Sequence, residues 1–271
     1  MNPKISIIMG TYNEEPNQIK KAIKSILNQT FKDFEFIIII DNPKNIKVKK
    51  AISQIKDKRI QIIENKENLG LAKTLNIGIT KAKGKYIARM DADDFSNKNR
   101  LKVQYEFMEK NKKTDLCFTW AKYIDEKGRI NKKINPKNIF TKNLKKTFFK
   151  KHIFTHPTLL CKKEVLFENK YNEDFKKAQD YELWIRLIYK NYNFKIIEKY
   201  LFERAVYSDE NYDDRIRKVR NTNKYKLKAL SINFKIFNIY FLKEYIKTLI
   251  FSIILILPKP VLKLAIKLKG N

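Results

Sequence analysis

Apolar residues follow two spacings in the first 90 residues of the chain. Short, mostly apolar runs occupy residues 5–9, 34–40, 59–63 and 86–90, and such runs are typical of strands buried on both faces of a sheet. Between the last two runs, residues 69–81 carry their apolar side chains on one helical face. A strand, a helix and a strand at this spacing predict βαβ units in a parallel sheet.

The first helix is expected soon after the first strand. Asn13 is a suitable N-cap, with Glu14 and Glu15 in the first turn and Pro16 near the start, because acidic residues and proline are favoured at helix N-termini. Apolar residues then recur with helical spacing as far as Leu27.

The second half of the chain alternates less regularly. A Lys-rich stretch, residues 127–151, offers few structural cues. Around it the pattern predicts helices at about 97–110 and 178–190, and strands at 115–120, 158–161, 194–197 and 200–206.

Polar segments follow three of the predicted parallel strands, at residues 10–14, 41–42 and 91–94. Ligands bind beyond the carboxyl ends of strands in such sheets, so these segments are expected to share one rim. The last segment holds Asp91, Asp93 and Asp94 in a chain with 59 Lys+Arg and 29 Asp+Glu. Adjacent carboxylates repel unless a cation lies among them, and hard oxygen ligands suit Mg²⁺ or Mn²⁺. The alternative is a solvated turn in which Asp94 or Ser96 caps the next helix.

Composition limits the other possibilities. The formal net charge of +30 suggests nucleic-acid binding, but the lysines are spread evenly, without an Arg-rich block or zinc-ligand spacing. Cys117 and Cys161 lie in apolar stretches, which favours buried thiols in a reducing compartment. The N-terminus lacks the features of a signal peptide. We therefore expect a cytoplasmic protein that does not bind nucleic acid.

The C-terminal part changes character, so the sequence predicts a main domain at 1–205 and a helical segment at 206–271. Residues 236–257 are rich in Ile, Leu and Phe, but the uninterrupted apolar core is shorter than the ~20 residues of a spanning helix. Residues 261–269 alternate Leu, Ile and Lys as in a basic amphipathic helix. The segment either packs on the main domain or, as we favour, lies on an anionic membrane surface, on the inner face of the cell membrane.

No glycine-rich phosphate loop or Walker motif is present, so a diphosphate would need a metal and basic side chains. Four blocks, residues 6–14, 34–42, 67–78 and 84–94, resemble the successive motifs of family 2 glycosyltransferases. These are inverting enzymes with a GT-A fold that use nucleotide-sugar donors. The resemblance covers about residues 4–205 and implies an α/β fold with a Rossmann-like, mostly parallel sheet flanked by helices and a helical C-terminal extension.

The resemblance assigns donor contacts to specific residues. Asp41 would hydrogen-bond the base, usually uracil, although Asn-Pro follows it here instead of a second Asp. Asp91 would lie near ribose or sugar hydroxyls, and Asp93 would hold the metal. The remaining donor contacts implied are Thr11, Tyr12, Asn13 and Glu14 on the first loop, Gly70, Lys73 and Asn76 over the nucleoside, and Arg89 and Ala92 beside the acids.

Asp180 is the candidate base. It precedes Leu183 and Trp184 by three and four residues, which puts it on the inward stripe of the predicted helix, and the helix dipole favours its ionised form. An ordinary N-terminal carboxylate would look the same, but the segment resembles the family block that carries the catalytic base, whereas Glu182 points elsewhere.

Two further residues have weaker support. His156, in His-Pro-Thr, could contact donor phosphate, metal or acceptor, or be structural. Arg204 could pair with the leaving diphosphate or simply be solvated.

Together these features predict a glycosyltransferase that moves a sugar from a nucleotide-sugar, expected to be a UDP-sugar, to a saccharide or lipid-linked acceptor, as in lipopolysaccharide or capsule synthesis. A nucleotidyltransferase on a related fold would use similar acids but generally needs a glycine-rich loop. A basic nucleic-acid-binding protein is supported only by charge.

Overall fold

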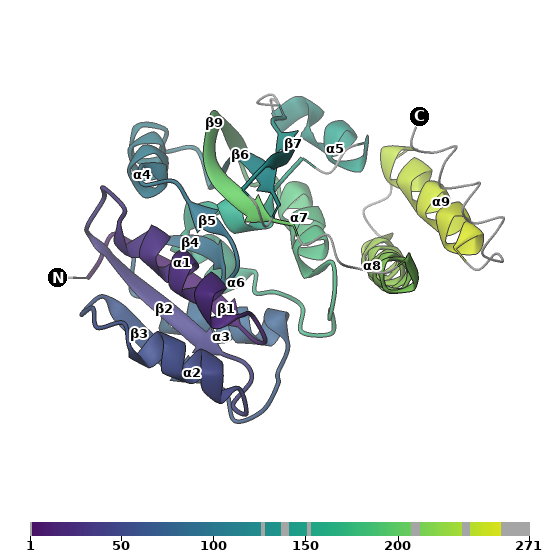
Figure 1. Ribbon diagram of the computed structural model, residues 1–271. Helices are drawn as coiled ribbons and strands as arrows, with labels where there is room; N and C mark the ends of the chain where they lie inside the picture. Colours follow the sequence, from purple (N-terminus) through teal and green to yellow (C-terminus); the bar gives the residue numbers. More distant parts are fainter. Residues whose placement is uncertain are drawn as a thin grey trace.

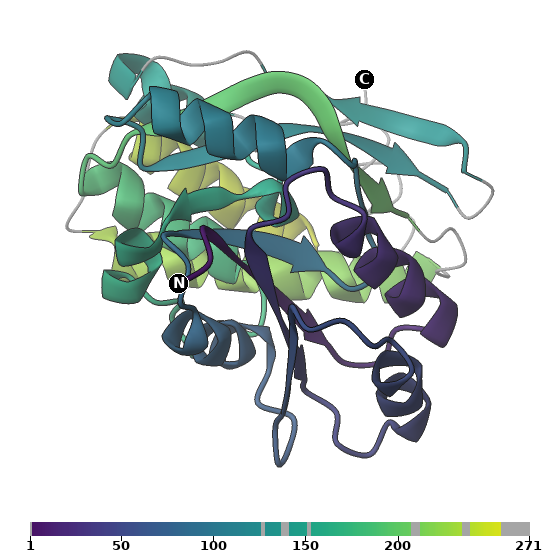
Figure 2. The same ribbon diagram turned by 90° about the vertical axis from the view of Figure 1, so that its left-hand side faces the viewer.

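The computed structural model describes residues 2–125, 128–136, 141–150, 153–206, 212–234 and 239–255. Its centre is a nine-stranded sheet in the order β3-β2-β1-β4-β8-β6-β9-β5, with β7 paired to β6. Helices cover both faces of this sheet (Figures 1 and 2). The predicted α/β architecture is confirmed.

The N-terminal half of the sheet is parallel, as predicted. Its strands are β1 (Ile5–Thr11), β2 (Phe34–Ile40), β3 (Ile60–Glu64) and β4 (Tyr86–Asp91). β1 pairs with β2 and β4, and β2 pairs with β3, all in parallel. The carboxyl ends of the four strands therefore meet at one edge.

Burial on both faces explains the unbroken apolar runs. Successive side chains of a strand point to opposite faces. Phe36 and Ile38 of β2 accordingly belong to one hydrophobic cluster, whereas Ile37 and Ile39 belong to another. The first cluster packs under α1 (Pro16–Leu27), α2 (Ile46–Ser53) and α4 (Arg100–Lys110), and the second under α3 (Leu71–Lys81), α5 (Thr141–Lys150), α6 (Lys163–Glu168) and α7 (Gln179–Tyr189).

The second half of the sheet is mixed and departs from the predictions in three places. The Lys-rich stretch contains β7 (Ile130–Ile134) and α5. The strand expected at 158–161 is a 3₁₀ turn (His156–Thr158) followed by β8 (Leu160–Lys162). The two strands expected at 194–206 form one strand, β9 (Phe194–Ala205), which pairs in parallel with β6 (Leu116–Ile124), while β5 is Phe95–Ser96.

The predicted cap of the first helix is wrong, and the alternative interpretation of the acidic turn as a helix cap is excluded. Glu15, not Asn13, caps α1 through a capping box with Gln18, because Pro16 occupies the first helical turn. Neither Asp94 nor Ser96 caps α4, which begins at Arg100 after Asn99. The acidic turn after β4 is therefore not a helix cap.

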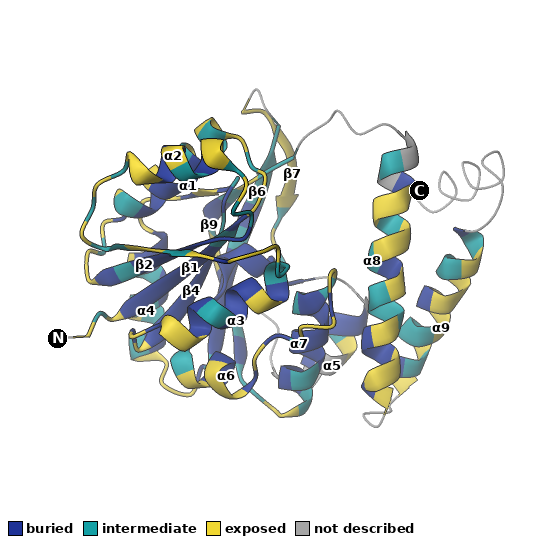
Figure 3. Cartoon of the chain, turned by 90° about the horizontal axis from the view of Figure 1, so that it is seen from below, coloured by how far each residue is buried: buried dark blue, intermediate teal, exposed yellow. Residues whose placement is uncertain are grey.

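The last two helices, α8 (Tyr212–Ile232) and α9 (Ile239–Ile254), lie side by side, as Figure 3 also shows. α8 packs against α7, and α9 packs against α5. Phe241 of α9 is fully buried in the cluster that covers the α3 face. In the described part of the chain, no helix is both long and apolar enough to cross a membrane. The amphipathic helix predicted at 261–269 lies outside the described residues.

Cys117 and Cys161 are buried free thiols, as predicted. Burial raises the pKa of the Cys117 thiol to about 12.

Candidate active site

The three polar segments after β1, β2 and β4 meet at one rim, as the strand order predicted. Gly10 pairs with Asp91 across β1 and β4, and Thr11 pairs with Ile40 across β1 and β2. The backbone N–H of Asp41 donates to the carbonyl oxygen of Thr11 at 2.8 Å. The candidate residues of the first loop, Asp41 and Asp91 are thus neighbours in space.

Glu14 shapes the first loop. Its Oε2 accepts hydrogen bonds from the Thr11 hydroxyl and from the Tyr12 backbone N–H, both at 2.7 Å. Asn13 accepts a hydrogen bond from Asn42 at 2.6 Å, which ties this loop to the end of β2. Thr11 is buried, whereas Tyr12 is 42% exposed. The loop therefore offers the Tyr12 side chain to a ligand at the rim.

Asp41 organises the segment before α3. Its buried carboxylate accepts from Asn65 Nδ2 at 2.7 Å and from the backbone N–H groups of Leu69 and Gly70 at 2.9 Å. Gly70 has a φ of 80°, which glycine adopts without the Cβ penalty of other residues. A carboxylate has about four acceptor directions, so Asp41 retains capacity for one further donor.

The two candidate donor-binding residues on α3 differ in their exposure to solvent. Lys73 is exposed. Asn76 is buried, and its side-chain amide hydrogen-bonds the backbone of Tyr171 and the carboxylate of Glu173. Through these hydrogen bonds, the Asn76 side chain faces residues 171–173.

The three acids after β4 have different surroundings. Asp91 forms an ion pair with the buried guanidinium of Arg89. One oxygen of Asp94 accepts from the Ala205 backbone N–H at 3.0 Å, while Oδ2 is buried and has no hydrogen-bond partner. Ala92 is buried, and Asp93 is half-buried beyond it. Oδ2 of Asp94 is therefore the buried oxygen of this turn that has no donor among the described residues.

These surroundings also separate the acidities of the three groups. Burial would raise the pKa of Asp91, but the nearby positive charges, Arg89 first, hold it below its ordinary value. Burial and the Asp91 charge raise the pKa of Asp93 to about 6. Burial and the charges of both neighbours raise the pKa of Asp94 well above its ordinary value. Negative charge at neutral pH is consequently concentrated on Asp91 and Asp93.

Two pockets open on either side of this turn. Asp91, Arg204 and Tyr123 border a pocket of about 400 Å³, whereas Asp93 and Asp94 border one of about 560 Å³. Alternation along β9 explains the division, since Arg204 faces the first pocket and its neighbours Glu203 and Ala205 line the second. The acidic turn therefore lies between the two pockets.

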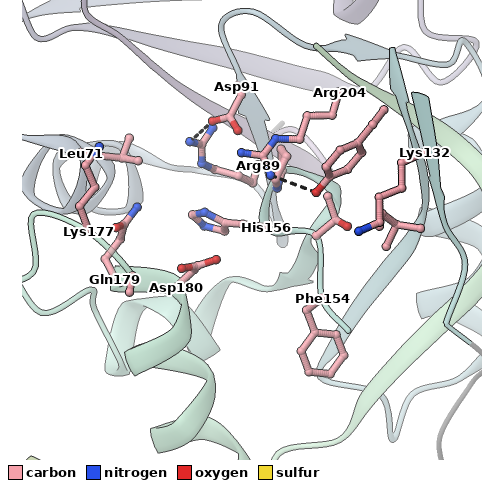
Figure 4. Close-up of a pocket in the computed structure, with 15 residues that line it drawn as sticks. Leu71, Arg89, Asp91, Lys132, Phe154, His156, Lys177, Gln179, Asp180 and Arg204 are labelled. Atoms are coloured by element: carbon pink, nitrogen blue, oxygen red, sulfur yellow. Dashed lines mark hydrogen bonds and ion pairs between the residues drawn. The ribbon is translucent and has the colours of Figure 1, made fainter. Parts of the chain in front are cut away.

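The first pocket brings together candidates from distant parts of the sequence (Figure 4). Asp91, Arg89, His156, Asp180 and Arg204 all line it. They come from β4, the 3₁₀ turn, α7 and β9, so a ligand in this pocket would meet acids and bases from both halves of the sheet.

Asp180 lies in the first turn of α7. Its Oδ1 accepts from the Tyr181 backbone N–H at 2.8 Å, and the preceding cap residue, Ala178, has a φ of 54°. Leu183 and Trp184 on the same face are fully buried. The Asp180 carboxylate faces the pocket from the first turn of α7, whereas Glu182 is paired with Arg186 at 2.7 Å.

His156 is buried at the pocket wall, and its Nε2 lies 2.7 Å from the Tyr171 hydroxyl. Burial, followed by the charge of Arg89, lowers the pKa of His156 to about 4. The imidazole is therefore neutral across the physiological range.

The sequence interpretation missed several lining residues. Tyr123 accepts a hydrogen bond from Arg204 Nη1 at 3.3 Å and lies under its guanidinium. Lys132 of β7 and Lys177 before α7 add positive charge to the pocket. Lys132 lies in the stretch without structural cues, and only its pairing with Tyr123 in the β6–β7 hairpin places it here.

Some of these groups fit a metal site. No cluster of three or more His, Cys, Asp or Glu side chains suited to a metal occurs within the described ranges. Mg²⁺ and Mn²⁺ commonly use one or two carboxylates together with substrate phosphates. Asp93, a half-buried carboxylate that borders the second pocket, is a ligand of this kind.

Comparison of the sequence with known proteins finds glycosyltransferases. The sequence model of glycosyl transferase family 2 matches residues 6–168. An uncharacterized glycosyltransferase of Methanocaldococcus jannaschii is 42% identical over 274 residues, which cover 99% of this chain and 94% of that protein. The O-antigen biosynthesis glycosyltransferase WbnJ of Escherichia coli is 34% identical over 186 residues, covering 68% of this chain and 71% of WbnJ.

Among solved structures, the chain is similar to S. aureus TarS 1–349 in complex with UDP-GlcNAc, with a TM-score of 0.63 and 18% identity. The alignment covers 95% of this chain and 82% of that one. This similarity shows that the two chains share a fold.

Proposed function

Since the chain belongs to glycosyltransferase family 2, we propose that it transfers a sugar from a UDP-sugar to a hydroxyl group of a saccharide or lipid-linked saccharide. The observation that carries this proposal is the shared pocket of Asp91 and Asp180 beside the carboxyl ends of the parallel strands. The nucleotide-sugar complex of TarS and the O-antigen role in the name of WbnJ support the choice of donor and of surface polysaccharide synthesis.

In this proposal the nucleotide lies along the rim. The exposed Tyr12 side chain stacks on the base, and Asp41 uses its remaining acceptor capacity for a base N–H. Leu71, at the start of α3, borders the pocket that holds Asp91, so a donor extending from Asp41 past α3 brings its sugar towards Asp180.

Asp93 would hold Mg²⁺ or Mn²⁺, with Asp94 beside it. A bound ion supplies charge neutralisation for the diphosphate and stabilises the leaving group. Arg204 lies close enough to the acids to contribute further positive charge on the pocket side of the turn.

Asp180 acts on the acceptor. Its carboxylate accepts the proton of the acceptor hydroxyl, the hydroxyl oxygen forms a bond to the anomeric carbon, and the bond from that carbon to the UDP oxygen breaks. In-line attack inverts the anomeric configuration. The proton remains on Asp180 until solvent removes it, and UDP leaves as the other product.

Tyr12→Ala should test the nucleotide site directly. Base stacking on an aromatic side chain contributes about 1–3 kcal/mol, so we expect UDP affinity to fall by roughly ten-fold or more in titration calorimetry. Phe167→Ala removes an exposed aromatic ring from α6 and serves as the matched control with unchanged affinity. Equal UDP binding by Tyr12→Ala and the wild type would remove Tyr12 from the site.

We further propose that α9 lies on an anionic membrane surface. Ile239, Ile246, Ile250 and Ile253 are 45–57% exposed, and their spacings of seven, four and three residues place them on one face of the helix. The opposite face, with Phe241, is buried against the protein. Lys243 and Lys247 are exposed on the same helix, an arrangement suited to acyl chains and acidic head groups.

Vesicle sedimentation tests this surface. The wild type should bind phosphatidylcholine vesicles containing phosphatidylglycerol in a salt-sensitive way, whereas a combined Ile246→Glu, Ile250→Glu, Ile253→Glu variant should lose at least about ten-fold in affinity, since each methylene contributes roughly 0.8 kcal/mol. Ile46→Glu with Ile62→Glu, at exposed positions elsewhere, is the control. Undiminished binding by the triple variant, or self-association through α9 without lipid binding, would contradict the proposal.

A further inference from the structure

A buried hydrogen bond connects the pocket to the segment before α7. His156 Nε2 and the Tyr171 hydroxyl are 2.7 Å apart, and both residues are more than nine-tenths buried. No hydrogen bond joins His156 Nδ1 to any described residue of the chain. His156 lines the pocket, so Nδ1 is the ring nitrogen left for a ligand there.

The backbone of Tyr171 is itself held by α3. Asn76 Nδ2 donates to the Tyr171 carbonyl oxygen, and Asn76 Oδ1 accepts from the Tyr171 N–H, both at 2.9 Å. One side-chain amide thus satisfies both peptide groups of Tyr171. The helix that carries Asn76 also supplies Leu71 to the pocket wall.

The geometry points to Tyr171 as a positioning residue for His156: its hydroxyl donates to Nε2, which fixes the imidazole as the Nδ1–H tautomer and presents that N–H to the substrate in the pocket. Asn76 keeps the hydroxyl in place. This inference rests on the proposed function for the identity of the substrate, but the tautomer is a property of the protein alone.

The charges around His156 are of both signs, so the hydrogen bond with Tyr171 is the contact that sets the tautomer. A neutral imidazole has one donor and one acceptor nitrogen, and the partner of one sets the role of the other. Asp91 and Arg89 on β4, Asp180 on α7 and Arg204 on β9 all influence its ionisation. An N–H directed into the pocket would face Asp91 and Asp180, which are negative, as well as an oxygen-rich donor.

Histidine ¹⁵N NMR can test the tautomer, because the chain contains only His152 and His156 and His152→Gln assigns the spectrum. At pH 7 the wild type should show His156 with a protonated Nδ1 and an unprotonated Nε2. In Tyr171→Phe, which keeps the ring and removes the hydroxyl, we expect both nitrogens to move towards values averaged between the two tautomers.

Kinetics provide a second readout. Loss of orientation should lower kcat by about 10- to 100-fold while the KM for the donor and UDP affinity stay within two-fold of the wild type. Tyr192→Phe removes a tyrosine hydroxyl bonded to Asn169 at 3.0 Å and should leave the His156 spectrum and kcat unchanged. An Nε2–H tautomer in the wild type, or identical His156 spectra in the wild type and Tyr171→Phe, would overturn the inference. An inactive wild type with the expected spectrum would instead count against the proposed function alone.

Discussion

Replacing Asp180 with asparagine is expected to lower kcat by about 10²- to 10⁴-fold, the range that a positioned general base contributes. Asparagine has nearly the same shape, and its Oδ1 can still accept the Tyr181 N–H bond that Asp180 makes. It cannot accept a proton from the acceptor hydroxyl. Folding and UDP affinity should therefore be preserved, and the loss should appear in single-turnover transfer measurements.

Asp174→Asn is the matched control, since Asp174 precedes the same helix and its side chain is 78% exposed. This variant should transfer sugar at the wild-type rate. A rate for Asp180→Asn within a few-fold of the wild type would remove Asp180 from the mechanism, and equal losses in both variants would indicate a general effect of charge.

Asp93→Asn should reduce transfer by about 10²- to 10³-fold, comparable with the removal of one group that stabilises developing charge in a transition state. The carboxylate oxygen that would hold Mg²⁺ or Mn²⁺ becomes an amide, so the Mn²⁺ concentration needed for half-maximal activity should also rise. Both quantities can be obtained from initial rates in a Mn²⁺ titration at saturating donor.

Glu203→Gln is a suitable comparison because Glu203 borders the same pocket as Asp93 from β9. Its Mn²⁺ dependence should match that of the wild type. Unchanged Mn²⁺ dependence in Asp93→Asn would show that another group holds the metal.

The parallel half of the fold could be predicted because strands that are buried on both faces of a sheet are unbroken apolar runs in the sequence. β2 is apolar at nearly every position, and its alternate residues enter different cores. Because consecutive parallel strands end at one edge, the meeting of the Thr11, Asp41 and Asp91 segments also followed from strand order.

The second half could not be predicted as well, because its strands depend on tertiary pairing. In β9 the polar pair Glu198-Lys199 suggested a break between two strands. In the structure, Thr119 of β6 pairs with Ile197, and the next residue, Trp120, pairs with Tyr200. The strand continues through this bulge. β7 is largely exposed, so it lacks the apolar alternation that would mark it.

The site residues could be predicted where they lie within a short motif of the sequence. The acidic turn was found because three carboxylates within four residues stand out in a chain of net charge +30, whereas Asp180 was found from its helical spacing and from the resemblance of its segment to a family motif. The distinct surroundings of Asp91, Asp93 and Asp94 depend on Arg89 and on the β9 backbone. Asn76 and Tyr171 are 95 residues apart in the sequence, so no local sequence pattern predicts their contact.

Membership of glycosyltransferase family 2 also decides between the alternatives that composition had left. The basic charge suggested nucleic-acid binding, and the acids alone also suited a nucleotidyltransferase. The family match includes the acidic turn after β4 and the rim formed by β1 and β2.

The central claim is tested most directly by incubating the wild-type protein with a panel of UDP-sugars and candidate saccharide acceptors, with and without Mn²⁺. UDP release would be followed enzymatically and the product's anomeric configuration by ¹H NMR. The account predicts acceptor-stimulated, Mn²⁺-dependent UDP release from at least one UDP-sugar, with an inverted product and no such release by Asp180→Asn. A product with retained configuration, or equal transfer by Asp180→Asn, would contradict it.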